Sequence, residues 1–240
     1  MADPARRAPA AGLEDGDPGA PPRHQAVLPA AAERNRPRPR RRNAARAAGH
    51  AALVVAAFIP LAILVFRFVT DDLGGEPIDA FEKQTGTWAL RFLAASLAVT
   101  PLRAFAGWSW LAPYRRTLGL VTFGYATVHL LAYSVLDMVG DLGDIGADIV
   151  KHPYVTLGMT SWLLLLPLAV TSTVAMQRRL GGVRWRRLHR LVYVVALTAT
   201  VHYLWSVKKD HTRPLVYAGV FATLLGARAL LARRRRVANA

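Results

Sequence analysis

The 240-residue sequence contains no cysteine at all. This absence excludes iron–sulfur clusters bound by cysteine, covalently attached c-type haem and disulfide bonds. The sequence also lacks a glycine-rich nucleotide fingerprint, which argues against an NAD(P)H-binding domain within the chain. Acidic residues are scarce: the chain has 15 Asp and Glu residues but 31 Lys and Arg residues, and its formal net charge is +16.

Hydrophobic residues make up 53% of the chain and come in blocks of about twenty, with the charges between the blocks. A soluble domain would spread its charges along amphipathic elements instead. The pattern therefore predicts an all-α membrane protein, a six-transmembrane-helix bundle with both termini cytoplasmic. The predicted spans are 50–68, 87–106, 117–136, 155–176, 189–207 and 214–231.

The orientation follows from the positions of the charges. If the N-terminus is cytoplasmic, the inward segments hold 24 of the 31 basic residues, and the outward loops hold ten of the fifteen acidic residues. This split agrees with the positive-inside rule, and it assigns the arginines to loops and tails rather than to a nucleic-acid surface. We expect a disordered basic cytoplasmic tail at 1–48, a transmembrane domain at 49–232 and a basic cytoplasmic tail at 233–240.

Two histidines lie deep inside the predicted spans. His129 is about twelve residues into 117–136, which places it roughly 18 Å from the cytoplasmic boundary at 1.5 Å per residue. His202 is thirteen residues into 189–207, at nearly the same depth. Both spans run in the same direction, so the two imidazoles can face each other across the bundle.

A polar side chain at membrane depth needs a partner or a function. Two facing neutral imidazoles are typical axial ligands of a b-type haem, and ligation also satisfies the ring nitrogen that would otherwise lack a partner. The alternative is a pair of histidines that hydrogen-bond between helices or relay protons. Small residues nearby would admit a flat macrocycle, although they serve plain helix packing equally well: Gly119, Gly124, Ala126 and Ala199.

His189 begins the fifth predicted span, level with an arginine-rich inward segment. Thirteen residues at 100° each leave it about 140° from the face of His202 on an ideal helix. The third span offers Arg115 and Arg116 at the matching depth instead of a histidine, and His50 in the first span is a weaker alternative. Two roles for His189 therefore stay open: it is either a third iron ligand or a histidine at the membrane interface.

Arginines are dense on the inward side of the predicted membrane, and the segment 177–190 alone carries six. The ordinary role of such arginines is to fix topology and contact lipid headgroups. The sharper hypothesis is a site for a phosphate-bearing cofactor, because arginine binds phosphate through paired donors. The candidates for binding a flavin nucleotide or a quinone are Arg115, Arg116, Arg186 and Arg187.

Several motifs, taken together in order over about residues 50–231, resemble the MsrQ (YedZ) family of the ferric-reductase-like transmembrane superfamily. They are QTGTWALRFL, TPLR, RRTLGL, HPYVTLG, TSTVAMQRRLG, RWRRLHRLVY and HYLWSVK. The resemblance implies a six-helix bundle that binds b-type haem and also uses FMN. The family's histidine positions match His129, His189 and His202.

The resemblance further implies a membrane electron-transfer subunit rather than a catalytic one. Electrons would pass from the cytoplasmic side, through a flavin reductase, or from the quinone pool to a periplasmic molybdopterin subunit, MsrP. That partner would reduce methionine sulfoxide and so repair oxidised exported proteins. We expect a multi-pass protein of the cell inner membrane that contacts lipid and no nucleic acid. The alternatives are a quinol-linked cytochrome b anchor of another oxidoreductase and a transporter or proton channel with a histidine relay.

Overall fold

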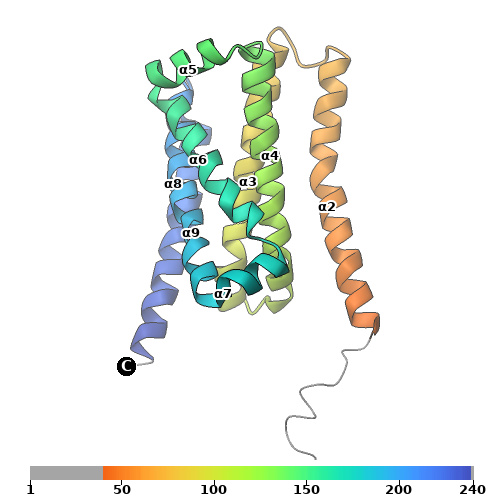
Figure 1. Ribbon diagram of the computed structural model, residues 1–240, viewed down its shortest axis with the longest axis vertical. Helices are drawn as coiled ribbons and strands as arrows, with labels where there is room; N and C mark the ends of the chain where they lie inside the picture. The colour runs from red at the N-terminus through yellow and green to blue at the C-terminus, as the bar shows by residue number, and fades with distance from the viewer. Residues whose placement is uncertain (1–39, 239–240) are drawn as a thin grey trace, which may run out of the picture. The chain divides into compact units, whose positions relative to one another are not determined.

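The computed structural model describes residues 40–238 of the chain, and these form helices joined by short turns (Figure 1). The chain divides at residue 44, and the helix bundle belongs to the unit from Ala45 onward. The longer helices are α2 (Arg40–Val69), α3 (Pro77–Phe105), α4 (Arg115–Leu131), α6 (Pro153–Val170), α8 (Leu191–Ser206) and α9 (Thr212–Val237). The shorter ones are η1 (Ser109–Tyr114), η2 (Ala132–Asp137), α5 (Leu142–Lys151) and α7 (Val174–Leu188).

The helices agree in part with the six predicted spans. By length and composition, four stretches of the described residues could cross a membrane: Ala44–Val69, Ser109–Asp137, Pro153–Val170 and Thr212–Arg234. Helix α8 is apolar but has 16 residues, or about 24 Å against a hydrocarbon core of about 30 Å. Helix α3 is long enough at 29 residues but carries charged residues along its length. The fold is therefore a multi-helix membrane protein, while the count of six spans and the cytoplasmic ends stay predictions.

The structure describes only part of each predicted tail. Residues 1–39 lie outside it, and α2 begins at Arg40, within the predicted tail 1–48. At the other end α9 continues to Val237, into the predicted tail 233–240. The helices therefore extend into both segments that the sequence analysis assigned to tails.

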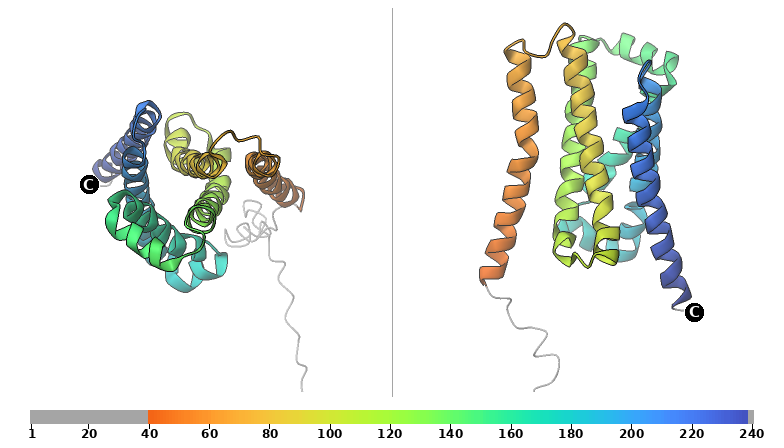
Figure 2. Two further views of the ribbon diagram at one scale, coloured as in Figure 1. Left: turned by 90° about the horizontal axis from the view of Figure 1, so that it is seen from above. Right: turned by 180° about the vertical axis from the view of Figure 1, so that it is seen from behind.

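Two helix pairs form the framework of the bundle. Helix α3 packs along α4, and α6 packs along α8, while α9 lies against both α3 and α8 (Figure 2). The core between them is largely aliphatic, and its most buried members are Leu97, Val195, Ala196 and Phe221. Burial of such side chains contributes about 1.5–3 kcal/mol each in water; within lipid, close packing supplies the attraction instead. The two pairs are thus held at a fixed separation by their shared core.

Helix α2 packs against the α3–α4 pair. The fully buried Tyr125 of α4 donates a hydrogen bond of 2.7 Å from its hydroxyl to the backbone carbonyl of Ala57. Leu64 of α2 packs in a second small cluster with Phe81 and Ala132. Large apolar side chains on the rest of α2 are exposed, as expected for a helix that faces lipid.

Two segments that the sequence analysis treated as loops are helical. Helix α5 begins where the Asp141 carboxylate accepts hydrogen bonds from the backbone N–H groups of Gly143 and Asp144. Helix α7 begins where the Thr173 hydroxyl accepts from the N–H of Met176. Figure 1 shows that both lie across the ends of the longer helices, α5 at one end and α7 at the other. Each end of the bundle is therefore covered by a short capping helix.

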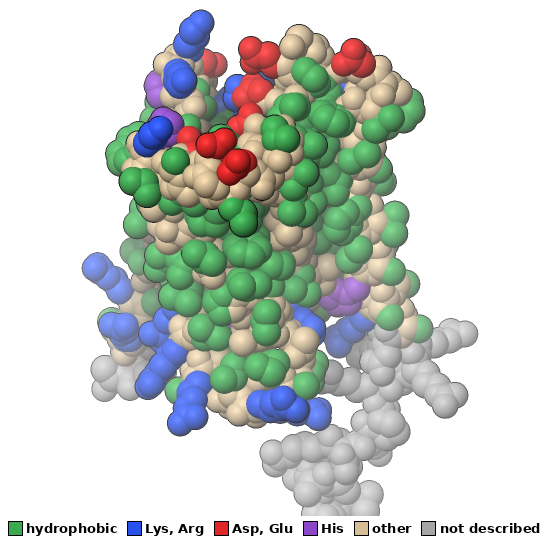
Figure 3. Space-filling view, turned by 45° about the horizontal axis from the view of Figure 1, so that its top comes forward, with side chains coloured by type: hydrophobic (Ala, Val, Ile, Leu, Met, Phe, Trp, Pro, Cys, Tyr) green, Lys and Arg blue, Asp and Glu red, His purple; other side chains and the backbone are tan. Residues whose placement is uncertain are grey.

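The charged side chains separate between the two ends. In Figure 3 the acidic side chains gather at the end that bears α5, while most of the visible lysines and arginines lie at the opposite end. This is the separation on which the predicted orientation depends. We call the α5 end the outer end and the α7 end the inner end.

Candidate functional site

The two mid-span histidines meet in the structure, as the sequence analysis predicted. His129 lies in the last turn of α4 and His202 in the second half of α8. Their ring centres are 6.1 Å apart, with an angle of 69° between the ring planes. The two imidazoles therefore face each other between the α3–α4 pair and the α6–α8 pair.

Each imidazole is oriented by a backbone carbonyl of its neighbouring helix. Nδ1 of His129 lies 3.0 Å from the carbonyl oxygen of Glu82 in α3, and Nδ1 of His202 lies 2.7 Å from that of Tyr154 in α6. Because a carbonyl oxygen only accepts, Nδ1 must carry the proton in both rings. The lone pair of each neutral ring is then on Nε2, which has no hydrogen bond among the described residues. Metal-binding histidines commonly have this arrangement.

Two glycines allow the imidazoles to approach those carbonyls. A Cβ atom added to Gly86 would lie 3.2 Å from Nδ1 and Cε1 of His129, and one added to Gly158 would lie 2.9 Å from the same atoms of His202. Each glycine stands four residues after the residue that supplies the carbonyl, which is one helical turn. The same arrangement, a carbonyl that bonds the imidazole and a glycine one turn later that leaves room for it, therefore occurs on both sides of the site.

The separation of the rings fits a shared metal ion. Imidazole nitrogens bind metals at about 2.0–2.1 Å, and each nitrogen lies roughly 1.1 Å from its ring centre, so two imidazoles that held one ion between their Nε2 atoms would have centres about 6.2–6.4 Å apart. The observed distance is 6.1 Å. With Nδ1 protonated and Nε2 available on both rings, the donor chemistry fits as well.

The outer side of the site is closed by polar contacts. The backbone changes from α-helix to the π-helical turn η2 just after His129, a feature often found at functional sites. Tyr133 in this turn donates a 2.7 Å hydrogen bond to Asp148 of α5, whose other carboxylate oxygen lies 2.7 Å from Nδ1 of His152. These two contacts join helix α5 to η2, the turn that follows His129.

The residue whose backbone carbonyl orients His129 also carries a carboxyl group with a shifted pKa. Burial, with smaller contributions from Asp137 and Asp79, raises the pKa of Glu82 to about 7. The same residue supplies the carbonyl that orients His129. Burial therefore favours the protonated form of this carboxyl group.

His189 lies apart from this pair. It caps the C-terminus of α7, its ring stacks on Trp185 at 3.9 Å, and its Nδ1 lies 3.1 Å from the Trp185 carbonyl oxygen. Its Nε2 is buried with no hydrogen-bond partner among the described residues. His189 thus shares the protonation state of the pair, and the described contacts give it no facing imidazole.

The other histidines are engaged elsewhere. Nδ1 of His50 lies 2.8 Å from the Thr117 hydroxyl, and its ring packs on Tyr114. His152 pairs with Asp148 at the outer end. The contacts of His50 give no support to its pairing with His189.

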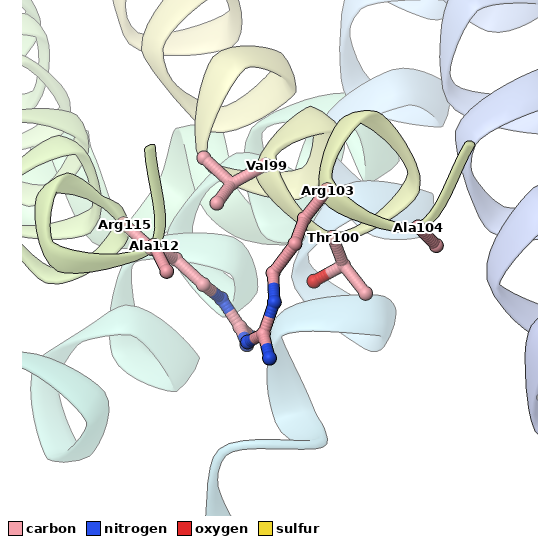
Figure 4. Close-up of a pocket in the computed structure, with 6 residues that line it drawn as sticks. All are labelled: Val99, Thr100, Arg103, Ala104, Ala112 and Arg115. Carbon is pink, nitrogen blue, oxygen red and sulfur yellow. The ribbon is translucent and has the colours of Figure 1, made fainter. Parts of the chain in front are cut away.

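The four arginines proposed to bind a cofactor do not all line the pocket that contains Arg115. Arg115 lines a pocket at the inner end of α3, while Arg116, Arg186 and Arg187 are absent from its walls. The Arg186 guanidinium lies back along α7, 3.2 Å from where a Cβ of Gly182 would be. The structure instead brings Arg103 of α3 into the pocket beside Arg115 (Figure 4).

Sequence reasoning missed several residues of these sites. Gly119 and Gly124 stood out as small residues, but they face Ser96 and Phe58 respectively and serve helix packing. The glycines that contact the histidines are the two at 86 and 158, in TGTW and LGMT. A glycine inside an apolar helix is itself a signal of close approach, but it does not say what approaches.

A bundle of membrane-type helices with two facing imidazoles defines the class of protein. The family model for the ferric reductase like transmembrane component matches residues 85–200, a range that includes His129 and His189 and ends just before His202. The fold and the comparison therefore agree on a ferric-reductase-like transmembrane protein.

Individual relatives narrow this class to one family. The chain is 50% identical over 188 residues to the protein-methionine-sulfoxide reductase heme-binding subunit MsrQ of Rhodospirillum rubrum, covering 78% of this chain and 90% of the relative. It is 48% identical over 189 residues to MsrQ of Xanthomonas campestris pv. campestris, covering 76% of this chain and 84% of the relative. It is 42% identical over 189 residues to MsrQ of Herminiimonas arsenicoxydans, covering 78% of this chain and 87% of the relative. The chain belongs to the MsrQ family.

Proposed function

We propose that the chain binds b-type haem between His129 and His202 and acts as the electron-transfer subunit of a methionine-sulfoxide reductase system. The observation that carries this proposal is the geometry of the imidazole pair, with ring centres 6.1 Å apart and both Nδ1 atoms bonded to helix carbonyls. The relatives are named heme-binding subunits, which supports the same ligand. When bound, haem supplies a one-electron redox centre.

The chain's own residues would bind and orient this cofactor. The carbonyls of Glu82 and Tyr154 fix the ring tautomers, and Gly86 and Gly158 leave room for the rings to reach them. The apolar surroundings exclude water and favour neutral imidazoles over charged ones. These contacts make the site a preorganised ligand set.

The same contacts argue against a proton relay. A relay histidine takes up a proton on one ring nitrogen and releases one from the other. In both rings Nδ1 faces a backbone carbonyl, which cannot pass a proton onward. A transporter or channel built on these histidines would therefore need both rings to turn.

We place the acceptor at the outer end. A subunit of a protein-methionine-sulfoxide reductase implies a catalytic partner, which we propose to be a periplasmic MsrP-like molybdopterin protein. The chain itself would pass electrons to this partner and carry out no bond chemistry on methionine sulfoxide. The donor would be the quinone pool or a cytoplasmic flavin reductase, and the protein would lie in the cell inner membrane.

FMN is the second cofactor in this proposal. Its phosphate would be bound by arginines at the inner end, for which the sequence offers Arg115, Arg116, Arg186 and Arg187. Of these, Arg115 lines a pocket in the structure. His189, whose buried Nε2 lacks a partner among the described residues, is our candidate for a further iron ligand at the same end.

Purified protein tests the proposal directly. Pyridine haemochrome and flavin assays give the number of haem and FMN molecules per polypeptide. We expect a red preparation with a dithionite-reduced alpha band, and at least one haem per chain. A colourless preparation from haem-replete cells would favour the relay. A haem-loaded protein that does not reduce an MsrP-like partner would favour a cytochrome b anchor of another oxidoreductase.

A further inference from the structure

The inner end of the described chain has many guanidinium groups and no carboxylate. The segments 103–116, 177–190 and 228–238 contain no Asp or Glu. The ion pairs among residues 40–238 are Arg67–Asp72, Lys83–Asp79 and His152–Asp148, and none of them involves an inner arginine. An anion that neutralises these arginines is therefore not provided by the described helices.

Two of these arginines converge on one pocket. Figure 4 shows the guanidinium groups of Arg103 and Arg115 turned toward each other from α3 and α4. The pocket has a volume of about 180 Å³ and is lined by Val99, Thr100, Arg103, Ala104, Ala112 and Arg115. Like charges repel at such a site unless an anion lies between them. The convergence thus indicates a binding site for an anion.

A third arginine lies behind the pocket wall. Arg228 of α9 is 9% exposed and donates hydrogen bonds to the Leu97 carbonyl at 3.1 Å and to the Thr100 hydroxyl at 2.9 Å. Its guanidinium also lies over the Tyr193 ring, 5.3 Å from the ring centre. Because the Thr100 oxygen accepts from Arg228, its own O–H group is left to donate elsewhere. Arg228 therefore adds positive charge and orients a donor that lines the pocket.

We propose that this pocket binds a phosphate group. Two guanidinium forks and one hydroxyl offer more donors than a single carboxylate can accept, while a phosphate presents three oxygens. A cavity of roughly 150 Å³ takes a benzene molecule, so this pocket of about 180 Å³ admits the five heavy atoms of a phosphate. The rest of the phosphate-bearing molecule lies outside the pocket, and the binding residues are Thr100, Arg103 and Arg115, with Arg228 as a positioning residue.

Two sources could supply this phosphate, the FMN of the proposed function and the headgroup of an anionic lipid. The flavin source rests on the proposed function, whereas the phosphate site itself does not. Riboflavin, which is FMN without the phosphate, separates ring binding from phosphate binding.

The test uses the full-length protein in nanodiscs of zwitterionic lipid, with and without added phosphatidic acid. The variants are Arg103→Lys, Arg115→Lys and Thr100→Val, and Arg179→Lys, an exposed arginine of α7 away from the pocket, is the matched control. FMN and riboflavin binding are measured by equilibrium dialysis, bound phosphatidic acid by mass spectrometry and haem by pyridine haemochrome.

We expect each pocket variant to bind FMN about tenfold or more weakly, with riboflavin affinity and haem content unchanged and Arg179→Lys equal to wild type. If FMN binding is unchanged but bound phosphatidic acid falls, the phosphate site stands and its ligand is a lipid headgroup, while FMN binds elsewhere on the protein. If neither ligand is affected, the proposal is wrong. Loss of haem with unchanged phosphate binding overturns it too, because the pocket would then serve a haem carboxylate.

Discussion

Adding one methyl group at Gly158 should weaken cofactor binding without loosening the helix that carries it. A Cβ at this position would lie 2.9 Å from Nδ1 and Cε1 of His202, whereas ordinary contact begins at 3.4 Å. The ring must therefore recede by about 0.5 Å, the difference between the two distances. Nδ1 and Cε1 form the edge of the ring that reaches the Tyr154 carbonyl, so this movement acts on the hydrogen bond directly.

The size of the effect follows from that hydrogen bond. Its length is 2.7 Å, and a retreat of 0.5 Å extends it to about 3.2 Å, the upper end of the usual range for N–H···O. Loss of a hydrogen bond that orients a metal ligand typically costs 10–100-fold in affinity. Because the bond is stretched but not lost, we expect Gly158→Ala to weaken haem binding by up to about tenfold, the lower end of that range. Gly86→Ala needs a shift of only 0.2 Å, from 3.2 to 3.4 Å, and should cost less.

The helix propensity of alanine stabilises the folded protein, so a loss of haem in these variants reports the contact with the ring and not unfolding of the helix. Alanine favours an α-helix over glycine by about 1 kcal/mol, so the variants should not unfold for that reason. Gly219→Ala in α9 is the control, because a Cβ there meets nothing within 4 Å. The assay is haem per polypeptide after purification, followed by haem titration of the apoprotein. The reasoning is refuted if Gly158→Ala binds haem as tightly as Gly219→Ala.

The inner arginines, His189, the α2 contact and the topology can each be tested separately. Replacing Arg115 and Arg116 together by lysine keeps the charge but removes the bidentate forks, so flavin affinity and the rate of haem reduction should fall while the haem spectrum stays the same; equal values would leave topology as their role. His189→Ala should leave the main haem spectrum intact and alter only a second centre, which redox titration would resolve. Tyr125→Phe removes the 2.7 Å hydrogen bond to Ala57 and should cost about 1 kcal/mol, seen as a lower melting temperature with unchanged haem content; an unchanged melting temperature would show that the bond is not stabilising. Reporter fusions should read as periplasmic after residues 80, 145 and 210 and as cytoplasmic after 110, 183 and 238, and a consistent inversion would reverse the proposed electron flow.

The sequence predicted those features that hydrophobicity and depth control. Counting residues from the charged boundary placed His129 and His202 at one level, and they meet in the structure. The apolar blocks likewise predicted an all-helical membrane fold. These predictions succeed because both the rise per residue and the cost of polar groups in lipid are nearly independent of the rest of the fold.

Features that depend on a neighbouring helix could not be predicted in the same way. Gly86 and Gly158 matter because of the rings that pack on them, and Arg103 joins Arg115 only because α3 and α4 pack against each other. Helix α5 lies in 137–153, which was expected to be an outward loop because it is polar and joins two apolar spans. Its stability comes from its N-cap and from the bond between Tyr133 and Asp148, a tertiary contact that periodicity does not reveal.

The most direct test of the account is the haem spectrum of His129→Ala and His202→Ala. His211→Ala serves as the control, since this exposed residue precedes α9 at the outer end. Each protein is purified from haem-replete cells, and its reduced-minus-oxidised spectrum is scaled to pyridine haemochrome per polypeptide. We expect both pair variants to lose the low-spin spectrum of two axial imidazoles and the control to keep it. If both pair variants keep the full spectrum, His129 and His202 are not the ligands and the central claim is wrong.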